Sequence, residues 1–395
     1  MAIHPFKIKP VVKNYLWGTL GKQSLVARLA GEGDPNQHYA ELWVGGHPQA
    51  SSIATLSSGN TALDELIKAH GQELLGERVN TRFPGELPFL FKILSIQEPL
   101  SIQAHPDLTL AEELHSRDSK NYPDKNHKPE IAIALSEFKL LYGFRPLSEL
   151  VQLTQEHPEL NSLLNDSKAI LDEEGAFVEA LYSSLALAES EKLAVITRAI
   201  AARLTNSVSE LSEQEKLFIN LNSKFGDTDI GVVTSLLMNF VTLQPFESIY
   251  TAPNILHAYV SGEIVECMAT SDNVVRGGLT PKFKDVSTLV AMLDYQASLP
   301  NLVQAKQVPN QINCLRYAAP VTEFCLEMLS GPSQITFQRS QEFAIYFCLN
   351  GRVRISSKAF SIIELVAGES CLVPATYSPC LVEVIEGTIF RVVVP

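Results

Sequence analysis

The pattern of apolar residues changes twice along the chain, and this limits the folds that the chain can adopt. Between residues 146 and 240 proline becomes scarce, and apolar side chains recur three or four positions apart, as at Leu193, Ile196 and Ile200. That spacing is typical of one face of an α-helix. The segments on either side carry short apolar runs broken by glycine and proline, which is typical of β-strands. We therefore predict a helical insertion at 146–240 in a mainly β chain.

A short motif before the insertion carries polar groups that suit a metal ion. Gln103 and His105 lie two positions apart, so on a strand both side chains point to the same face. Glu130 follows a proline, and His257 lies beyond the insertion. Together these residues offer one amide oxygen, two imidazoles and one carboxylate, a donor set that fits Zn²⁺ or a similar divalent ion. The alternative is that the histidines are ordinary surface or core side chains.

The candidate ligands lie on both sides of the helical block, and this bears on the domain organisation. If one barrel holds all four ligands, that barrel is discontinuous and combines residues 1–145 with residues 241–300. At 395 residues the chain is long enough for two or three domains. We therefore expect a third region at 301–395.

Residues 301–395 again show apolar runs typical of strands. Asn350-Gly351, between two such runs, predicts a hairpin with a type I′ turn. His257 is the last histidine in the chain, so this region cannot build a site from imidazoles. We expect a β-barrel without metal, which packs its apolar strands against the rest of the chain or against another chain.

The overall composition argues against several classes of protein. The net charge of −13 disfavours general binding to nucleic acid or to anionic membranes, and a phosphorylated ligand would need a local basic cluster. No run of about 18 apolar residues occurs, so we expect no transmembrane helix. The N-terminus lacks the apolar core of a signal peptide. The six cysteines form no Cys-x-x-Cys pair, which predicts buried free thiols in a reducing cytoplasm.

Five segments of the chain together resemble a known family. They are NYLWG at 14–18, AELW at 40–43, PLSIQAHP at 99–106, NHKPE at 126–130 and SDNVVRGGLTPK at 271–282. With these blocks the chain is similar to the type I mannose-6-phosphate isomerases of the cupin superfamily. The resemblance implies a mainly β fold with two cupin-like jelly-roll barrels and a helical domain. It also implies an enzyme that interconverts mannose 6-phosphate and fructose 6-phosphate through a cis-enediol.

The same resemblance implies roles for individual residues. The positions that match the family's ligands to one Zn²⁺ per chain are Gln103, His105, Glu130 and His257. The position that matches a catalytic arginine is Arg276. The positions that the resemblance suggests for phosphate contacts are Ser101, Lys92 and Lys282.

The implied reaction moves a proton between C1 and C2 of an open-chain sugar, and negative charge grows on the enediol oxygens. An arginine keeps its proton, so Arg276 suits stabilising that charge or binding phosphate rather than acting as a base. The sequence does not rank the possible bases. The residues that we predict to be catalytic are Arg276, Lys128, His127 and Asp272. The residues that we predict to bind substrate are Ser101, Lys92, Lys282 and Glu266, and the last of these is also a possible base.

Two other functions compete with an isomerase. One is a non-catalytic cupin that binds a sugar or regulates. The other is a metal-dependent oxygenase, which the glutamine disfavours because non-haem iron sites prefer two histidines and one carboxylate. For the isomerase we expect a phosphorylated hexose as partner, no nucleic acid or membrane, and a cytoplasmic monomer or weak homo-oligomer.

Overall fold

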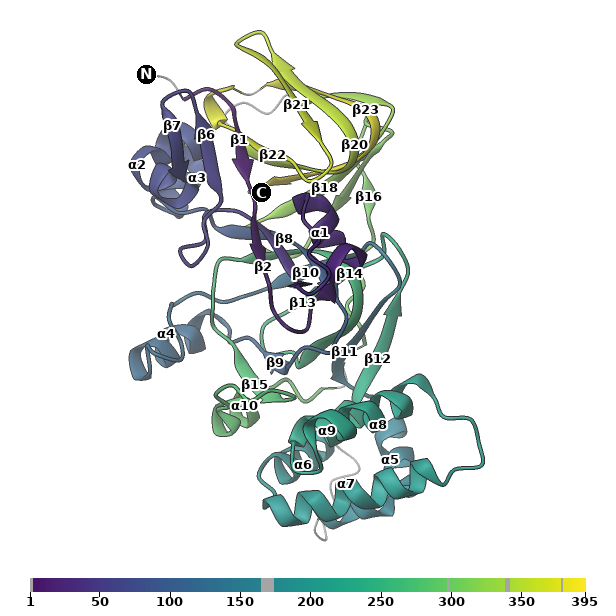
Figure 1. Cartoon of the computed structure of the whole chain (residues 1–395). Coiled ribbons are helices and arrows are strands. Elements are labelled where there is room, and N and C mark those ends of the chain that lie inside the picture. The colour runs from purple at the N-terminus through teal and green to yellow at the C-terminus, as the bar shows by residue number, and fades with distance from the viewer. Residues whose placement is uncertain (1–2, 165–173, 297–298, 338–341, 378) are drawn as a thin grey trace.

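The computed structural model describes residues 3–164, 174–296, 299–337, 342–377 and 379–395. Figure 1 shows three regions in succession: a sheet rich in C-terminal strands, another sheet in the middle of the molecule, and a group of helices at the far end. The order agrees with the prediction of a mainly β chain that carries a helical insertion. The sheet in the middle of the molecule carries the candidate site and is called the first sheet below. The sheet rich in C-terminal strands is called the second sheet.

The first sheet has ten strands among the described residues, and it combines segments from before and after the helices. The strand β14 is its longest member and pairs with β8, β10, β11 and β9, so it connects most of the sheet. The strands are β2 (Val11–Lys13), β5 (Glu41–Val44), β8 (Phe89–Ile96), β9 (Ile102–Ala104), β10 (Glu130–Ala134), β11 (Phe138–Phe144), β12 (Met238–Leu243), β13 (Ser248–Thr251), β14 (His257–Ala269) and β15 (Val275–Gly278).

The second sheet has eleven strands in the described part of the chain. Most of them come from the last hundred residues. The strands are β1 (Phe6–Lys9), β6 (Ile53–Leu56), β7 (Gly59–Ala62), β16 (Lys306–Gln307), β17 (Cys314–Tyr317), β18 (Cys325–Ser330), β19 (Ser333–Phe337), β20 (Ala344–Ser357), β21 (Phe360–Val366), β22 (Ser370–Val373) and β23 (Cys380–Val393). A separate two-stranded sheet joins β3 (Thr19–Leu20) to β4 (His38–Tyr39).

The expected division placed all of residues 1–145 with the candidate site, and the strand pairing corrects part of this. Strand β1 pairs with β22 in the register Phe6↔Leu372, and β6 and β7 extend the same sheet. Phe6 and Ile8 are thereby buried against C-terminal strands. The alternating pattern of β1 predicts a strand, but it contains no information about the sheet that the strand joins.

The turn predicted at Asn350-Gly351 is also wrong. Both residues lie inside the continuous strand β20, opposite Gly387 and Thr388 of β23. Gly351 has a φ of 80°, and a Cβ on it would lie 2.1 Å from the carbonyl oxygen of Glu386. The glycine therefore allows a close approach of two paired strands at an irregularity in the register, and the chain reverses only after Ser357.

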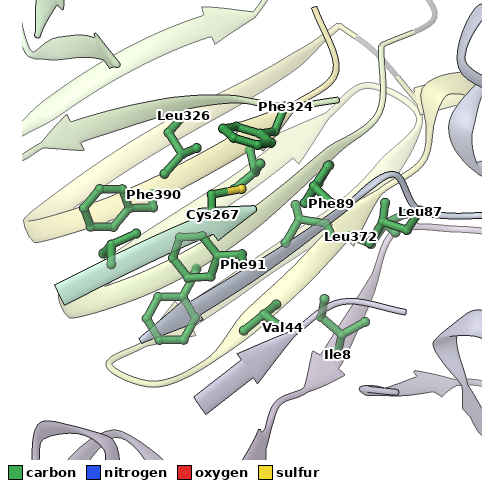
Figure 2. Packing of buried hydrophobic residues seen from close by; sticks show 14 of the residues in the cluster. Ile8, Val44, Leu87, Phe89, Phe91, Cys267, Phe324, Leu326, Leu372 and Phe390 are labelled. Atoms are coloured by element: carbon green, nitrogen blue, oxygen red, sulfur yellow. The ribbon is translucent and has the colours of Figure 1, made fainter. Parts of the chain in front are cut away.

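The two sheets pack against each other through an apolar core, which Figure 2 shows from close by. Side chains on β8 and β14 alternate, so that Phe91 and Cys267 face this core while Lys92 and Glu266 point to the opposite face. The ring of Phe91 lies 6.0 Å, centroid to centroid, from that of Phe390 on β23. The expectation that the C-terminal strands pack against the rest of the chain is confirmed. The opposite face, called the polar face below because it carries Lys92 and Glu266, also holds a small apolar cluster that includes Leu94 and Ala132.

Helices lie in both halves of the chain. The apolar stripe that predicted a helix is buried on α7, where Leu193, Ile196 and Ile200 are at most 2% exposed. The N-terminal region contains four helices where only strands were expected. The helices are α1 (Leu25–Ala30), α2 (Leu63–Leu75), α3 (Glu77–Arg82), α4 (Leu108–Arg117), α5 (Leu147–Glu156), α6 (Glu174–Ala186), α7 (Ser190–Thr205), α8 (Glu213–Phe225), α9 (Ile230–Leu237) and α10 (Val286–Met292).

The helical region is fixed to strand β15 at the start of α9. Asp229 caps this helix, and its Oδ1 accepts hydrogen bonds from the backbone N–H of Gly231 at 2.8 Å and of Leu279 at 2.9 Å. A Cβ on Gly278 would come within 2.5 Å of the Gly231 nitrogen, so only glycine permits this approach. The strand that carries Arg276 is therefore held by the insertion.

Helix α8 offers a test of local stability away from the sheets. Ser212 and Glu215 form a capping box, in which the Ser212 hydroxyl accepts from the Glu215 N–H at 3.2 Å and the Glu215 carboxylate accepts from the Ser212 N–H at 2.7 Å. We expect Ser212→Ala to lower the free energy of unfolding by about 1 kcal/mol. Urea unfolding followed by circular dichroism measures this change. A loss above about 3 kcal/mol would mean that Ser212 supports more than the start of one helix.

No helix among the described residues is both long enough and apolar enough to span a bilayer. All six cysteines are buried and free of disulfides.

Candidate metal centre and substrate site

Three predicted ligands meet on the polar face of the first sheet. His105 follows β9, Glu130 begins β10 and His257 begins β14. One nitrogen or oxygen atom from each lies within 4.8 Å of the others, and each side chain is at most 2% exposed. Among the described residues this is the one group of His, Cys, Asp or Glu side chains with such an arrangement. The strands thus bring His105 close to His257, which is more than 150 positions further along the chain.

Backbone carbonyls orient both imidazoles in the same way. Nδ1 of His105 lies 2.8 Å from the carbonyl oxygen of Asn273, and Nδ1 of His257 lies 2.9 Å from that of Ile255. A carbonyl only accepts, so each Nδ1 carries the proton and each Nε2 offers its lone pair. Both Nε2 atoms are buried, lack a hydrogen-bond partner, and lie 3.5 Å from the two oxygens of Glu130. This donor set fits Zn²⁺, because two lone pairs and a carboxylate converge without another partner.

Electrostatics keep His105 and Glu130 in the protonation states that a metal ion requires. Burial, together with the charge of Lys128, lowers the pKa of His105 to about 4, and Glu130 only partly offsets this effect. Burial alone would raise the pKa of Glu130, but Lys128 and the two imidazoles lower it well below its usual range. His105 is therefore neutral and Glu130 is ionised near neutral pH, as metal binding demands.

Gln103, the fourth predicted ligand, lies in a row with two other site residues. It is directly opposite His257 of β14 and directly opposite Arg276 of β15. Residues opposite each other in an antiparallel pair project to the same face. Its Oε1 accepts a hydrogen bond from the hydroxyl of Ser101 at 3.3 Å. Strand β9 therefore brings the predicted ligands Gln103 and His257, together with Ser101, beside Arg276.

Arg276 is half-buried on β15. In the described part of the chain no carboxylate forms an ion pair with it. Burial lowers the pKa of Arg276 from its ordinary value, and the nearby Tyr122 opposes this shift, but a guanidinium keeps its proton at any working pH. A half-buried cation without a carboxylate partner is suited to bind an anionic ligand.

Lys92 and Glu266 form a buried ion pair on the polar face of the sheet. They are opposite each other on β8 and β14, and Nζ of Lys92 donates to Oε2 of Glu266 at 2.8 Å. Burial alone would lower the pKa of Lys92, but Glu266, Glu41 and Glu130 raise it above its ordinary value. The Lys92 ammonium also lies 5.3 Å from the centroid of the Trp43 ring. The pair places one basic and one acidic side chain on this face, in contact with each other and almost fully buried.

The two neighbours His127 and Lys128 point to different partners. Nζ of Lys128 lies 2.9 Å from Oε1 of Glu130, at the metal centre. Nε2 of His127 lies 3.0 Å from Oε1 of Glu323, a residue just before β18 of the second sheet. Lys128 therefore belongs to the ligand cluster, whereas the imidazole of His127 contacts the other sheet. The catalytic role of His127 stays a prediction.

Two other predicted residues lie in loops beside the site. Asp272 is partly exposed; its Oδ1 lies 3.4 Å from Nε2 of His47, and its Oδ2 accepts from the Gln49 side chain at 2.7 Å. Burial alone would raise the pKa of Asp272, but His47, Lys128 and Lys92 lower it below its ordinary value. Lys282 is exposed in the loop after β15. Their roles also stay predictions.

The structure adds two side chains and one backbone contact that the sequence analysis did not select. Tyr259 follows His257 by two positions on β14, and burial and the charges of Glu266 and Glu130 raise its pKa well above the ordinary value. Glu41 is buried near Lys92, and burial raises its pKa. The spacing 257–259 was a signal for Tyr259, because alternate residues of a strand share a face. The hydrogen bond from Nδ1 of His105 to the backbone carbonyl of Asn273 left no comparable pattern in the sequence.

Comparisons with known proteins identify relatives of this chain. A family model described as phosphomannose isomerase type I, catalytic domain, matches residues 5–147. The chain is 39% identical to mannose-6-phosphate isomerase of Rattus norvegicus, over 84% of this chain and 83% of the relative. It is 37% identical to the enzyme of that name from Schizosaccharomyces pombe, over 83% of this chain and 87% of the relative.

Solved structures extend the match to nearly the whole chain. A variant of phosphomannose isomerase from Salmonella typhimurium superimposes with a TM-score of 0.88 at 30% identity, and the match covers 99% of each chain. A zinc-bound mannose 6-phosphate isomerase gives a TM-score of 0.87 at 31% identity with the same coverage. The two sheets, the helical insertion and the long sequence matches lead to one conclusion: the chain belongs to the type I phosphomannose isomerase family.

Proposed function

We propose that this protein is a zinc-dependent aldose–ketose isomerase that interconverts mannose 6-phosphate and fructose 6-phosphate. The observation that carries the proposal is the buried His105–Glu130–His257 cluster, in which two imidazole lone pairs have no partner. Lys128 contacts this cluster, and Arg276 lies beside it with no carboxylate partner among the described residues. The activity of the relatives and the zinc in the solved neighbour support the assignment.

One Zn²⁺ per chain would be held by Gln103, His105, Glu130 and His257. When bound, it supplies Lewis-acid polarisation of an oxygen atom, which lowers the cost of developing negative charge there. The surrounding residues exclude water, because both imidazoles and the Glu130 carboxylate are almost fully buried. The imidazoles are held by backbone carbonyls, so the ligands need little rearrangement to bind the ion.

The side chains around the metal centre divide the remaining tasks. Arg276 stabilises negative charge on the enediol oxygens, or binds the phosphate, with a guanidinium that remains protonated. Lys128 and Glu266 are the buried groups placed to move a proton between C1 and C2, through Nζ of Lys128 or a carboxylate oxygen of Glu266. Lys92 holds the Glu266 carboxylate in place through their hydrogen bond.

The substrate's phosphate needs cations that the average surface does not offer, because the net charge is −13. Ser101 lies beside Gln103, and Lys282 is exposed in the loop that follows Arg276. We place the phosphate near these residues, with His127 and Asp272 as further groups at the edge of the site. This arrangement would put the sugar carbons toward the buried metal centre.

The second sheet has a structural role in this proposal. Residues 301–395 contain no histidine, and the apolar face of their sheet is covered by the first sheet of the same chain. A face that is covered within the chain does not require a second copy, which supports a monomer or weak homo-oligomer. The buried free cysteines support a reducing, cytoplasmic location.

Metal removal tests the proposed function. Purified protein should contain about one zinc per chain by elemental analysis, chelation should abolish formation of fructose 6-phosphate in a coupled assay, and added Zn²⁺ should restore it. The measured quantity is turnover per chain, with Mg²⁺ added as a control that should not restore activity. Full turnover by protein shown to be free of metal would contradict the proposal. Zinc and sugar binding without turnover would favour a non-catalytic cupin.

A further inference from the structure

The loop around Asp124 forms a hydrogen-bonded junction next to the metal centre. Oδ1 of Asp124 accepts from the Ser271 hydroxyl at 2.8 Å, from the Asn273 side-chain amide at 3.1 Å and from the Asn126 N–H at 2.9 Å. Oδ2 accepts from the Asp272 N–H at 2.7 Å. One carboxylate thus joins the loop before β10 to the turn between β14 and β15.

The same turn carries the acceptor that orients His105. The backbone carbonyl of Asn273 lies 2.8 Å from Nδ1 of His105, and this bond leaves Nε2 free for metal. The Asn273 side chain is fully buried, and its Nδ2 donates to the carbonyls of Asp124 at 2.8 Å and Asn126 at 3.0 Å. The position of the carbonyl is therefore set by the contacts that Asn273 makes with the Asp124 loop.

The junction also lies between the other groups of the site. Four residues beyond Asn126 the chain reaches Glu130, and three residues beyond Asn273 it reaches Arg276. The side-chain amide of Asn126 donates to the carbonyl of Thr270 at 3.0 Å, which adds a second link between the two segments. A change at the junction would displace both segments where they lead into Glu130 and Arg276, although the hydrogen bonds of Asp124 within the described part of the chain reach other residues.

We infer that Asp124 is a positioning residue for the metal centre: it fixes the 271–273 turn, whose carbonyl sets the tautomer and direction of the His105 imidazole. The inference rests on the proposed zinc function. A carboxylate only accepts hydrogen bonds, and here it receives four donors. An asparagine at the same position would direct an amide N–H toward one of those donors, and the turn would have to move to relieve the conflict.

The test compares Asp124→Asn with the unchanged protein and with Ser212→Ala. Zinc affinity is measured by competition with a chromophoric chelator, and the ligand field is measured by the visible absorption of the Co²⁺-substituted protein. We expect Asp124→Asn to weaken zinc binding by about 10- to 100-fold, as for other residues that orient metal ligands, and to change the Co²⁺ spectrum. Ser212→Ala, which weakens only a distant helix cap, should leave the affinity and the spectrum unchanged.

A milder variant protects the test against a failure to fold. Ser271→Ala removes one of the four donors to Asp124, together with the hydroxyl that accepts from the Asn273 N–H at 3.1 Å, and should weaken zinc binding by a smaller factor in the same direction because the other three donors to Asp124 remain. The inference is overturned if Asp124→Asn, or Ser271→Ala where the first variant does not fold, binds zinc with the affinity and Co²⁺ spectrum of the unchanged protein. Absence of zinc binding by the unchanged protein would instead defeat the proposed function, so the two failures are distinguishable.

Discussion

Replacing Arg276 by alanine should lower kcat/KM by about a hundredfold or more, while the protein folds and retains its zinc. The residue is half-buried, has no carboxylate partner among the described residues, and lies opposite the predicted ligand Gln103. Removal of its side chain therefore breaks no ion pair that the fold depends on, but it removes the cation available to an anionic transition state. Steady-state kinetics with mannose 6-phosphate, together with zinc analysis of the same preparation, measure both quantities.

The distribution of the loss between kcat and KM identifies what Arg276 does. A fall in kcat indicates that the guanidinium stabilises the enediolate, whereas a rise in KM at constant kcat indicates that it binds the phosphate in both states. Arg198→Ala is a matched control, because Arg198 is an exposed arginine on α7 that pairs with Asp227. Normal kinetics for Arg276→Lys would contradict both roles, because the single ammonium group of lysine does not replace the planar guanidinium, which donates several hydrogen bonds in fixed directions.

Loss of His257 should abolish metal retention and, with it, turnover. His257→Ala removes one of two imidazoles from the cluster and leaves the buried Glu130 carboxylate with one nitrogen partner fewer. We expect zinc affinity to fall by more than about a hundredfold, since removal of a ligand should cost more than removal of a group that only orients one. Chelator competition measures the affinity, and the coupled assay measures turnover.

The control for His257→Ala is His70→Ala. His70 is about half exposed on α2, so its replacement removes one histidine from the protein without altering the first sheet. It should retain about one zinc per chain and normal turnover. If His257→Ala itself retained one zinc per chain with normal turnover, the assignment of His257 as a ligand would be wrong.

The sequence predicted those features that depend on local spacing. Gln103 and His105 share a face because a strand has a period of two, and the α7 stripe is buried because a helix has a period of 3.6. The fold class followed from the change of period between segments. These features could be predicted because each depends on neighbouring residues, whose relative directions the backbone determines.

Features that depend on distant partners could not be predicted in this way. Strand β1 joins the second sheet through contacts such as the bond from the Ser370 hydroxyl to the carbonyl of Ile8, across 362 positions. The side-chain direction of His127 depends on Glu323, which no local pattern connects to it. The Asp124 junction is built from turn residues whose hydrogen bonds depend on the approach of two loops.

The shared core of Figure 2 has a consequence for how the protein can vary. Strands β8 and β14 present Lys92 and Glu266 to one side and Phe91 and Cys267 to the other, so each strand contributes both to the candidate site and to the shared core. Neither sheet can detach without exposing aromatic rings of both. The second sheet therefore cannot be discarded or exchanged as an independent module during evolution, although none of the predicted metal ligands lies on it. Substitutions in the second sheet are constrained by the volume of a core that side chains of β8 and β14 also fill.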